Sequence, residues 1–285
     1  MLKWVKIDVI TEESEYPPPF FVGSMFRGAF GMALKRVVCI NPSYRCEGCF
    51  AAKECLYHQF YEEKNVEHPF RFDIVLQPKG FDFSLYLFED ATTSLPYVLS
   101  AVKKAFEEQG LGKERRKVCI RQIAVGRTIV YDGKDFLSLE GVELNELKSD
   151  TFCPDVEIEF TMPLRIKENN RFAREGVQLH TLVNNIHRRY RMLKGEPAEK
   201  LNYRVEGEVI EHQMRYVEMR RYSNRQRQQM NMGGIKGTMK IKGLDEQSYR
   251  YLKIGEIIGI GKQTVFGLGS YRIMDDRRQR EKEAV

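Results

Sequence analysis

Four of the six cysteines fall inside residues 39–55, where their thiols could bind a metal ion. In a reducing compartment such clustering argues against disulfides. Cys46 and Cys49 have the C-x-x-C spacing that holds a tetrahedral zinc ion, and four thiolates would complete a structural zinc site or suit an iron–sulfur cluster. The candidate structural ligands are Cys46, Cys49 and Cys55, with Cys39 as a weaker fourth. Because the spacing is irregular for a zinc ribbon, packed thiols without a metal are the alternative.

Positive charge gathers in two segments of the second half. The net charge is +6, from 46 Lys and Arg against 40 Asp and Glu, which becomes informative only where the charge is concentrated. Residues 214–230 contain five arginines and one acid, and residues 187–194 contain four bases and no acid. A solvated face is the commoner meaning of a basic run, but such faces usually interleave Glu and Asp. The two segments therefore indicate a surface for an anionic partner.

One of these segments lies on a predicted helix that carries a histidine. Apolar residues recur at helical spacing over residues 176–195. A polar stripe is predicted to face away from the core and comprises His180, Asn184, His187 and Arg191. His187 is a candidate catalytic residue because Arg188 and Arg189, beside it, could hold a phosphate. A surface or hydrogen-bonded structural histidine is the alternative.

A glycine-rich loop precedes the end of the chain. Glycines occur at positions 259, 261, 267 and 269, around Lys262, Gln263 and Thr264. Glycine permits positive φ and close approach, so successive N–H groups could point at a phosphate while Lys262 adds charge. The spacing fits neither the nucleotide-triphosphate loop nor the dinucleotide fingerprint. The loop is either an anion cradle or a tight connection from helix to strand.

The elements that must position these residues follow from hydrophobic periodicity. In the first half the pattern predicts a strand over 2–10, a helix over 21–38, a hairpin over 70–90, a helix over 94–110 and strands over 117–133. The second half repeats the order, with strands over 155–166, 215–223, 235–243 and 269–275 and helices over 176–195 and 245–259. The order βαββαβ thus occurs twice.

This order predicts an α+β fold of two tandem ferredoxin-like (RRM-like, βαββαβ) domains with a cleft between them. The first domain spans residues 1–150 and carries the Cys-rich insertion; the second spans 151–275 and carries the Gly-rich loop; residues 276–285 form a charged tail. No apolar run is long enough to cross a membrane, and the amino terminus alternates like a strand instead of a signal peptide. A cytoplasmic protein is expected, with no membrane partner.

Four stretches, taken in order, resemble one known family along nearly the whole chain. The first half contains "FRGAFGMALKRVVC" and "CEGCFAAKECLYHQFYE", and the second half contains "RRYSNRQRQQMNMGGIKGTM" and "GKQTVFGLGSYRI". They resemble the CRISPR-associated repeat-processing endoribonucleases of the RAMP superfamily. The resemblance implies a cytoplasmic enzyme of antiviral defence that binds single-stranded or hairpin CRISPR repeat RNA, with other CRISPR effector subunits as further candidate partners.

The resemblance also implies a reaction. The ribose 2′-hydroxyl attacks the adjacent phosphate, which cleaves precursor CRISPR RNA to 2′,3′-cyclic phosphate and 5′-hydroxyl ends without a metal or other cofactor in catalysis. Relatives often carry a histidine where Gly259 stands here, and others carry one near the first helix, where the nearest is His58, beside Tyr57 and Tyr61. His58 and His187 are therefore equal catalytic candidates, and a histidine-free mechanism is the alternative.

The basic strand is the expected RNA surface. If residues 215–223 form one strand, Arg220 and Tyr222 share a face suited to phosphate contact and base stacking. The RNA-binding candidates are Arg188, Arg220, Arg221, Tyr222, Arg225, Gly261, Lys262, Gln263 and Thr264. The same features fit a second function, a non-catalytic RAMP subunit that binds and holds CRISPR repeat RNA.

Overall fold

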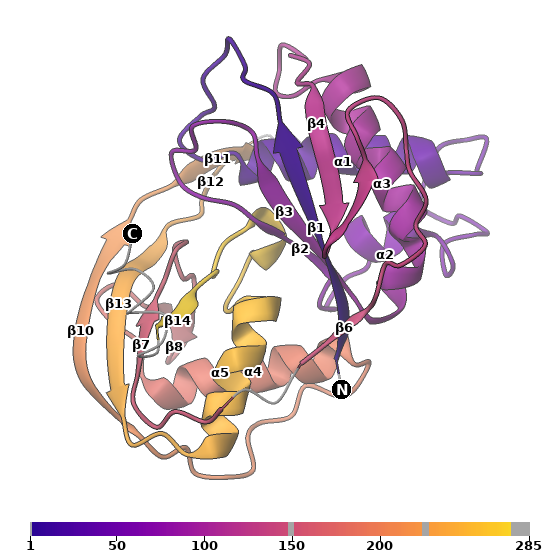
Figure 1. Ribbon diagram of the computed structural model, residues 1–285. Helices are drawn as coiled ribbons and strands as arrows, with labels where there is room; N and C mark the ends of the chain where they lie inside the picture. The colour runs from indigo at the N-terminus through magenta and orange to yellow at the C-terminus, as the bar shows by residue number, and fades with distance from the viewer. Residues whose placement is uncertain (1, 148–150, 224–227, 275–285) are drawn as a thin grey trace. The chain divides into compact units, whose positions relative to one another are not determined.

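The computed structural model describes residues 2–147, 151–223 and 228–274 (Figure 1). The chain divides into two compact units, Met1–Leu147 and Lys148–Val285. Because the division falls between two periodic halves of the sequence, each unit has its own sheet and its own core. The charged tail predicted for residues 276–285 lies outside the described residues.

The first unit is built on an antiparallel sheet. Its main path has the order β2-β3-β1-β4-β5, and β6 pairs with β1. The strands are β1 (Lys3–Thr11), β2 (Phe70–Asp73), β3 (Phe83–Phe88), β4 (Ile120–Val125), β5 (Thr128–Tyr131) and β6 (Asn145–Glu146). The register between β1 and β3 places Ile7 opposite Leu85 and so aligns the apolar alternation of both strands. The four strands β2, β3, β1 and β4 have the ferredoxin-like order.

Two helices cover one face of this sheet (Figure 1). They are α1 (Gly23–Val38) and α3 (Leu95–Lys103), with the short α2 (Leu56–Tyr61) between them along the chain. The single turn η1 (Glu89–Ser94) precedes α3, and the wider π turn η2 (Lys104–Gln109) follows it. Phe26 on α1 lies at the centre of an aromatic core with Phe72, Phe83 and Phe106.

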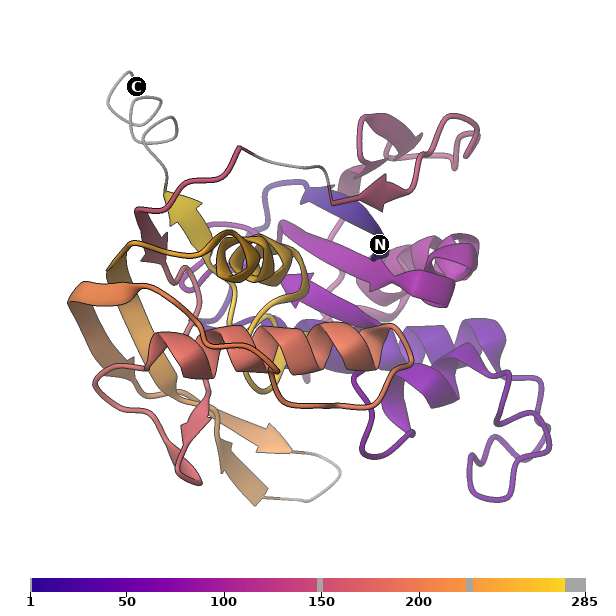
Figure 2. The ribbon, with the colours of Figure 1, turned by 90° about the horizontal axis from the view of Figure 1, so that it is seen from below.

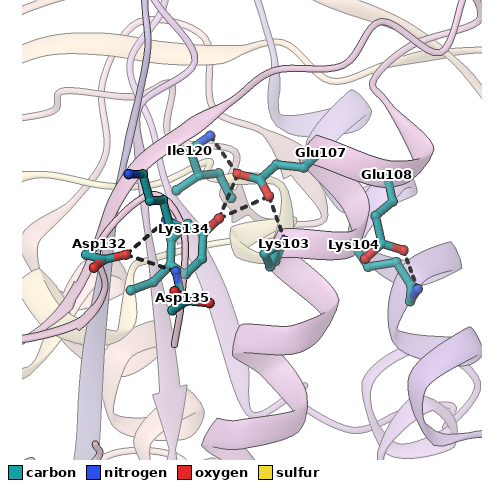
Figure 3. A network of polar contacts seen from close by, with 9 residues as sticks. Lys103, Lys104, Glu107, Glu108, Ile120, Asp132, Lys134 and Asp135 are labelled. Atoms are coloured by element: carbon teal, nitrogen blue, oxygen red, sulfur yellow. Dashed lines mark hydrogen bonds and ion pairs between the residues drawn. The ribbon is translucent and has the colours of Figure 1, made fainter. Parts of the chain in front are cut away.

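A carboxylate in η2 links the helical layer to the sheet (Figure 3). Glu107 accepts a hydrogen bond from the backbone N–H of Ile120 at 3.1 Å and from the Tyr131 hydroxyl at 3.2 Å. It also pairs with Lys103 at 3.0 Å, and this hydrogen bond raises the pKa of the lysine. The π turn therefore satisfies the first N–H of β4 from outside the sheet.

The second unit repeats the arrangement. Its sheet has the order β10-β13-β7-β14, from β7 (Val156–Glu159), β10 (Glu208–Val217), β13 (Gly234–Lys242) and β14 (Arg272–Met274). The helices α4 (Leu179–Leu193) and α5 (Glu246–Ile258) pack against each other (Figure 2). The Asp245 side chain begins α5 by accepting the N–H of Ser248 at 2.7 Å. The prediction of two ferredoxin-like βαββαβ units is confirmed.

One predicted strand is divided in the structure. Residues 215–223 are not a single strand, because β10 ends at Val217 and a separate β11 (Arg220–Ser223) pairs with β12 (Gln228–Asn231). Met219 lies at the break and is 4% exposed, and its carbonyl accepts the N–H of Met232 at 2.8 Å. The apolar side chain is buried at the corner, so the basic residues after it belong to a hairpin outside the main sheet.

Two short pairs complete the second unit. The hairpin β8 (Lys167–Glu168) and β9 (Arg171–Phe172) follows β7, and the single turn η3 (Thr264–Phe266) precedes β14. Within the described ranges, no helix is both long enough and apolar enough to span a lipid bilayer.

Candidate nucleic-acid interface

His187 is buried, which corrects the prediction that it faces away from the core. Its side chain on α4 is 9% exposed, and its Nδ1 is joined to the Tyr251 hydroxyl of α5 by a hydrogen bond of 2.9 Å. The two rings meet edge to face at 5.2 Å between centroids. Burial, followed by the positive charge of Arg191, lowers the pKa of His187. The imidazole is therefore neutral at neutral pH and packed between two helices.

The segment after α4 explains this burial. Residues 194–203 return along the polar stripe of the helix, where the Leu201 N–H donates to Asn184 Oδ1 at 3.0 Å. Arg191 donates to the Pro197 carbonyl at 2.9 Å and pairs with Glu199 at 3.3 Å. A stripe of polar residues was thus mistaken for a solvent face, because its partners come from an irregular segment that leaves no periodic signal. His180, earlier on the same stripe, is exposed.

Acidification is expected to destabilise the wild-type protein more than a His187→Gln variant. Since the folded pKa of His187 is lowered, the unfolded chain binds a proton near pH 6.5 that the folded chain resists. Stability is therefore lost as the pH falls through 6.5 toward the folded value, by at most about 1.4 kcal/mol per pH unit. Urea unfolding at about pH 7.5 and 5.5 measures this difference, with His180→Gln as the exposed control. Equal losses of the free energy of unfolding in the wild type and in His187→Gln would contradict this prediction.

His58 lies in the first unit, at the Cys-rich segment. It occupies the first turn of α2 and is half-exposed. The side chain lines a small cavity of about 10 Å³ together with all four clustered cysteines. Among the residues that the structure describes, no three Cys, His, Asp or Glu side chains stand together as ligands around an ion.

The glycine-rich loop is fastened to the second unit by its own backbone. The Gly261 N–H donates to Asn185 Oδ1 on α4 at 2.8 Å, and the Lys262 N–H donates to the Arg165 carbonyl at 2.8 Å. These two N–H groups are therefore engaged inside the fold, which favours the tight connection from helix to strand over the anion cradle. Gly261 has a φ of +81°, and a Cβ there would lie 2.7 Å from the Arg165 oxygen. The turn requires glycine, and it presents the exposed side chain of Lys262.

Arg165 lies beside this lysine, although no sequence pattern indicates it. The bridge between Leu164 and Ile235 places Arg165 at the start of β13, where its guanidinium donates to the Gly233 carbonyl at 2.9 Å. The same guanidinium lies 3.8 Å from the centroid of the Phe172 ring on β9. Arg165 is placed in the site by contacts with residues far along the chain, and such contacts leave no signal in the local sequence pattern.

The β11–β12 hairpin brings further cations to the same end of the sheet. Arg221 lies over the Phe266 ring of the glycine-rich loop at 4.7 Å and donates to the Met230 sulfur at 3.3 Å. Arg220 is exposed and pairs with Glu218 at 3.6 Å. An ion pair this exposed contributes little stability, so an RNA phosphate can compete with it. Arg165, Arg220, Arg221 and Lys262 are called the basic edge below.

The other predicted RNA contacts differ in their surroundings. Thr264 is 2% exposed, so its side chain does not belong to an accessible interface. Gln263 is half-buried with a φ of +69°, and Arg188 is exposed on α4. Tyr222 lies in the β11 backbone, while its side chain and the whole of Arg225 lie outside the described residues.

A buried arginine of α4 donates a hydrogen bond to the last residue of helix α5, just before the glycine-rich loop. Arg189 on α4 is 4% exposed, and its Nε donates to the Ile258 carbonyl at 3.0 Å. The predicted role of the segment "HRRY" as one basic surface is therefore divided: Arg188 faces solvent, whereas Arg189 caps the end of the neighbouring helix.

Residues 158–271 match the family model of the CRISPR-associated endoribonuclease Cas6, and residues 4–142 match a family model described as an N-terminal domain. The Cas6 match lies within the second unit, and the resemblance to the CRISPR-associated endoribonucleases is confirmed as a resemblance of this segment.

The comparisons with individual proteins extend over both units. An uncharacterised protein of Archaeoglobus fulgidus is 26% identical over 279 residues, which cover 91% of this chain and 93% of that relative. Thermus thermophilus Cas6 superposes with a TM-score of 0.59 at 13% identity, over 96% of this chain and 98% of that one. A Cas6 product complex gives 0.58 at 15% identity, over 96% and 99%. These structural likenesses show the fold.

Proposed function

We propose that the protein is an endoribonuclease that cleaves precursor CRISPR RNA within its repeats. The observation that carries the proposal is the basic edge, which lies inside the segment that matches the Cas6 family model. There Lys262 is held on a glycine turn against Arg165, and Arg221 packs on the same loop. A product complex of a Cas6 protein shares the fold. Guanidinium and ammonium groups gathered at one edge suit the phosphates of an RNA strand.

The proposed reaction uses a nucleophile that the RNA itself supplies. The ribose 2′-hydroxyl loses its proton and attacks the adjacent phosphorus, the bond from phosphorus to the 5′-oxygen breaks, and that oxygen takes up a proton. The products are a 2′,3′-cyclic phosphate and a 5′-hydroxyl. The protein needs only to align the strand and to stabilise the charged phosphorane, which positioned cations do without a metal ion.

The roles proposed for these side chains follow from the exposure and the contacts of each within its own unit. Arg165, Arg221 and Lys262 are proposed to bind the scissile phosphate and its neighbours. His187 is poorly placed for proton transfer, because it is buried against Tyr251. Consecutive residues turn by about 100° around a helix, so His187 also points roughly away from Asn185, which contacts the glycine-rich loop. Of the two candidate histidines we therefore propose His58, which is half-exposed, as the proton-transfer residue.

The test uses end-labelled repeat RNA in EDTA, beside the same RNA with a 2′-deoxy substitution at each position in turn. A single cut that one substitution abolishes is expected, because that ribose loses its nucleophile. His58→Ala is expected to slow cleavage by about 100-fold, the usual contribution of a positioned acid or base. His187→Ala is the matched histidine control, compared at equal folded protein. Cleavage that survives every 2′-deoxy substitution would contradict self-attack by the RNA.

A second candidate is a non-catalytic RNA-binding subunit. Gly259 ends α5 with a φ of +76° and has no side chain for proton transfer at the position where relatives often carry a histidine. This observation favours a protein that holds repeat RNA without cutting it. Tight binding without cleavage, across several repeat sequences, would support this function. The basic edge would then be the main RNA-binding surface of the protein.

A further inference from the structure

The four clustered cysteines line one cavity in the first unit. Cys39 follows the last turn of α1, Cys46 and Cys49 lie in the loop after it, and Cys55 begins α2. All four are free thiols of intermediate exposure. Thiols from three places along the chain thus face a common space of about 10 Å³, which is about the size of one water molecule.

Backbone and Asn41 contacts hold the loop in place, beside a weak hydrogen bond from the Cys39 thiol to the Asn41 carbonyl at 3.9 Å. The Cys39 N–H donates to the Lys35 carbonyl at 2.9 Å, and the Cys49 N–H donates to the Cys46 carbonyl at 3.2 Å. Asn41 closes the loop by donating to the Arg45 carbonyl at 2.9 Å. The backbone therefore presents the thiols to the cavity before any ligand is bound.

Helix α2 is fixed to α1 at its other end. The Tyr61 hydroxyl donates to the Arg27 carbonyl at 2.8 Å, and its ring lies against Gly31, where a Cβ would come within 2.6 Å of it. Burial raises the pKa of Tyr61 far above its usual range, so this hydroxyl keeps its proton. The two walls of the cavity are consequently joined by a contact outside it.

The charges at the cavity complement a thiolate centre. Lys35 and Arg45 line the same space as the cysteines. The Lys35 ammonium lies 5.0 Å from the Tyr44 ring and 4.9 Å from the Tyr57 ring, which hold it over the cavity. One Zn²⁺ with four thiolates has a net charge of −2, and these two cations would offset it. A cluster of neutral thiols needs no such cations.

We propose that Cys39, Cys46, Cys49 and Cys55 bind one zinc ion that joins the end of α1 to the start of α2. Four thiolates are the ligand set of many structural zinc sites, in which the ion is held tetrahedrally. No three side chains in the described part of the chain are yet in ligand positions, so binding draws the thiol side chains inward and releases their protons. The site is structural and does not depend on the proposed RNA cleavage.

Metal content of the full-length protein tests the proposal. The protein is expressed in zinc-supplemented medium, purified without chelator, and analysed for zinc, iron and sulfide. About one zinc per chain is expected in the wild type and less than about a tenth of that in the Cys46→Ser, Cys49→Ser double variant. The matched control is the Cys119→Ser, Cys153→Ser double variant, which removes the two cysteines outside the cluster and should retain the zinc.

Two further measurements keep the proposal testable if the double variant fails to fold. Titration of the wild type with a thiol-blocking mercurial should release its zinc as four thiols react. His58→Ala should retain zinc, whereas Cys39→Ser should lose it. Zinc lost from His58→Ala and retained by Cys39→Ser would overturn the four-thiolate site, and so would iron with sulfide, or no metal, in the wild type. Because the readout is metal content, failure of RNA cleavage would leave this result unaffected.

Discussion

Replacing Arg220, Arg221 and Lys262 together by alanine is expected to weaken binding of repeat RNA by on the order of 100-fold at 0.1 M salt. Each cation that contacts a phosphate releases a counterion, so three lost contacts with a single strand also reduce the slope of log K against log salt by about 2. The side chains stand on one hairpin and one loop that Arg221 joins by packing on Phe266. Filter binding or fluorescence anisotropy across a salt series measures both quantities.

A matched triple variant separates local contact from general charge. Lys200, Lys242 and Arg250 are exposed cations of the second unit, and Lys242 and Arg250 belong to the ends of β13 and α5 away from the basic edge. Their replacement by alanine removes the same charge and is expected to change RNA affinity by less than about threefold at 0.1 M salt, where charges beyond about 10 Å are screened. Equal losses in both triple variants would exclude the basic edge as a specific interface.

Gly261→Ala is expected to destabilise the second unit by about 3 kcal/mol. A side chain at a φ of +81° has a backbone strain of roughly 1 kcal/mol, and the new Cβ, at 2.7 Å from the Arg165 oxygen, must displace backbone at about 2 kcal/mol more. The displacement also breaks the hydrogen bond from the Lys262 N–H to the Arg165 carbonyl. RNA affinity should therefore fall together with stability. Denaturant unfolding followed by a probe of the second unit, together with RNA binding at a temperature where the variant is folded, measures the two effects.

The control for this substitution is Gly195→Ala. Gly195 has a similar φ of +74°, but a Cβ there meets nothing within 4 Å. It should therefore show only the backbone strain of roughly 1 kcal/mol and no change in RNA affinity. If both variants lose the same free energy of unfolding, close packing at Gly261 contributes nothing.

The order of elements could be predicted from the sequence because it depends on local periodicity. Strands such as β1 alternate cleanly between buried and half-exposed residues, and apolar positions of α4 such as Leu182 and Ile186 are buried as their helical spacing predicts. The division at Met219 could not be predicted, since the residues before and after it continue to alternate. The strand pairing, in which β11 pairs with β12 outside the main sheet, shows that β10 has ended, and Met219 is buried at the break.

The candidate site was predictable in part for the same reason. Charge and glycine content identified Lys262, Arg220 and Arg221, because a basic run and a glycine-rich loop are local features of the sequence. Arg165 was missed because its place depends on the Leu164–Ile235 bridge, and the burial of His187 was missed because its cover comes from an irregular segment. Whether a histidine is catalytic or packed is decided by such non-local contacts.

The buried hydrogen bond from Arg189 to Ile258 has an electrostatic consequence for the loop that follows. The carbonyl end of a helix carries about half a negative charge from its aligned peptide dipoles, and α5 ends at Ile258, directly before the glycine-rich loop. Left uncompensated, this end would repel an incoming phosphodiester. The guanidinium of Arg189 donates to that carbonyl, so its positive charge offsets the negative helix end beside Lys262.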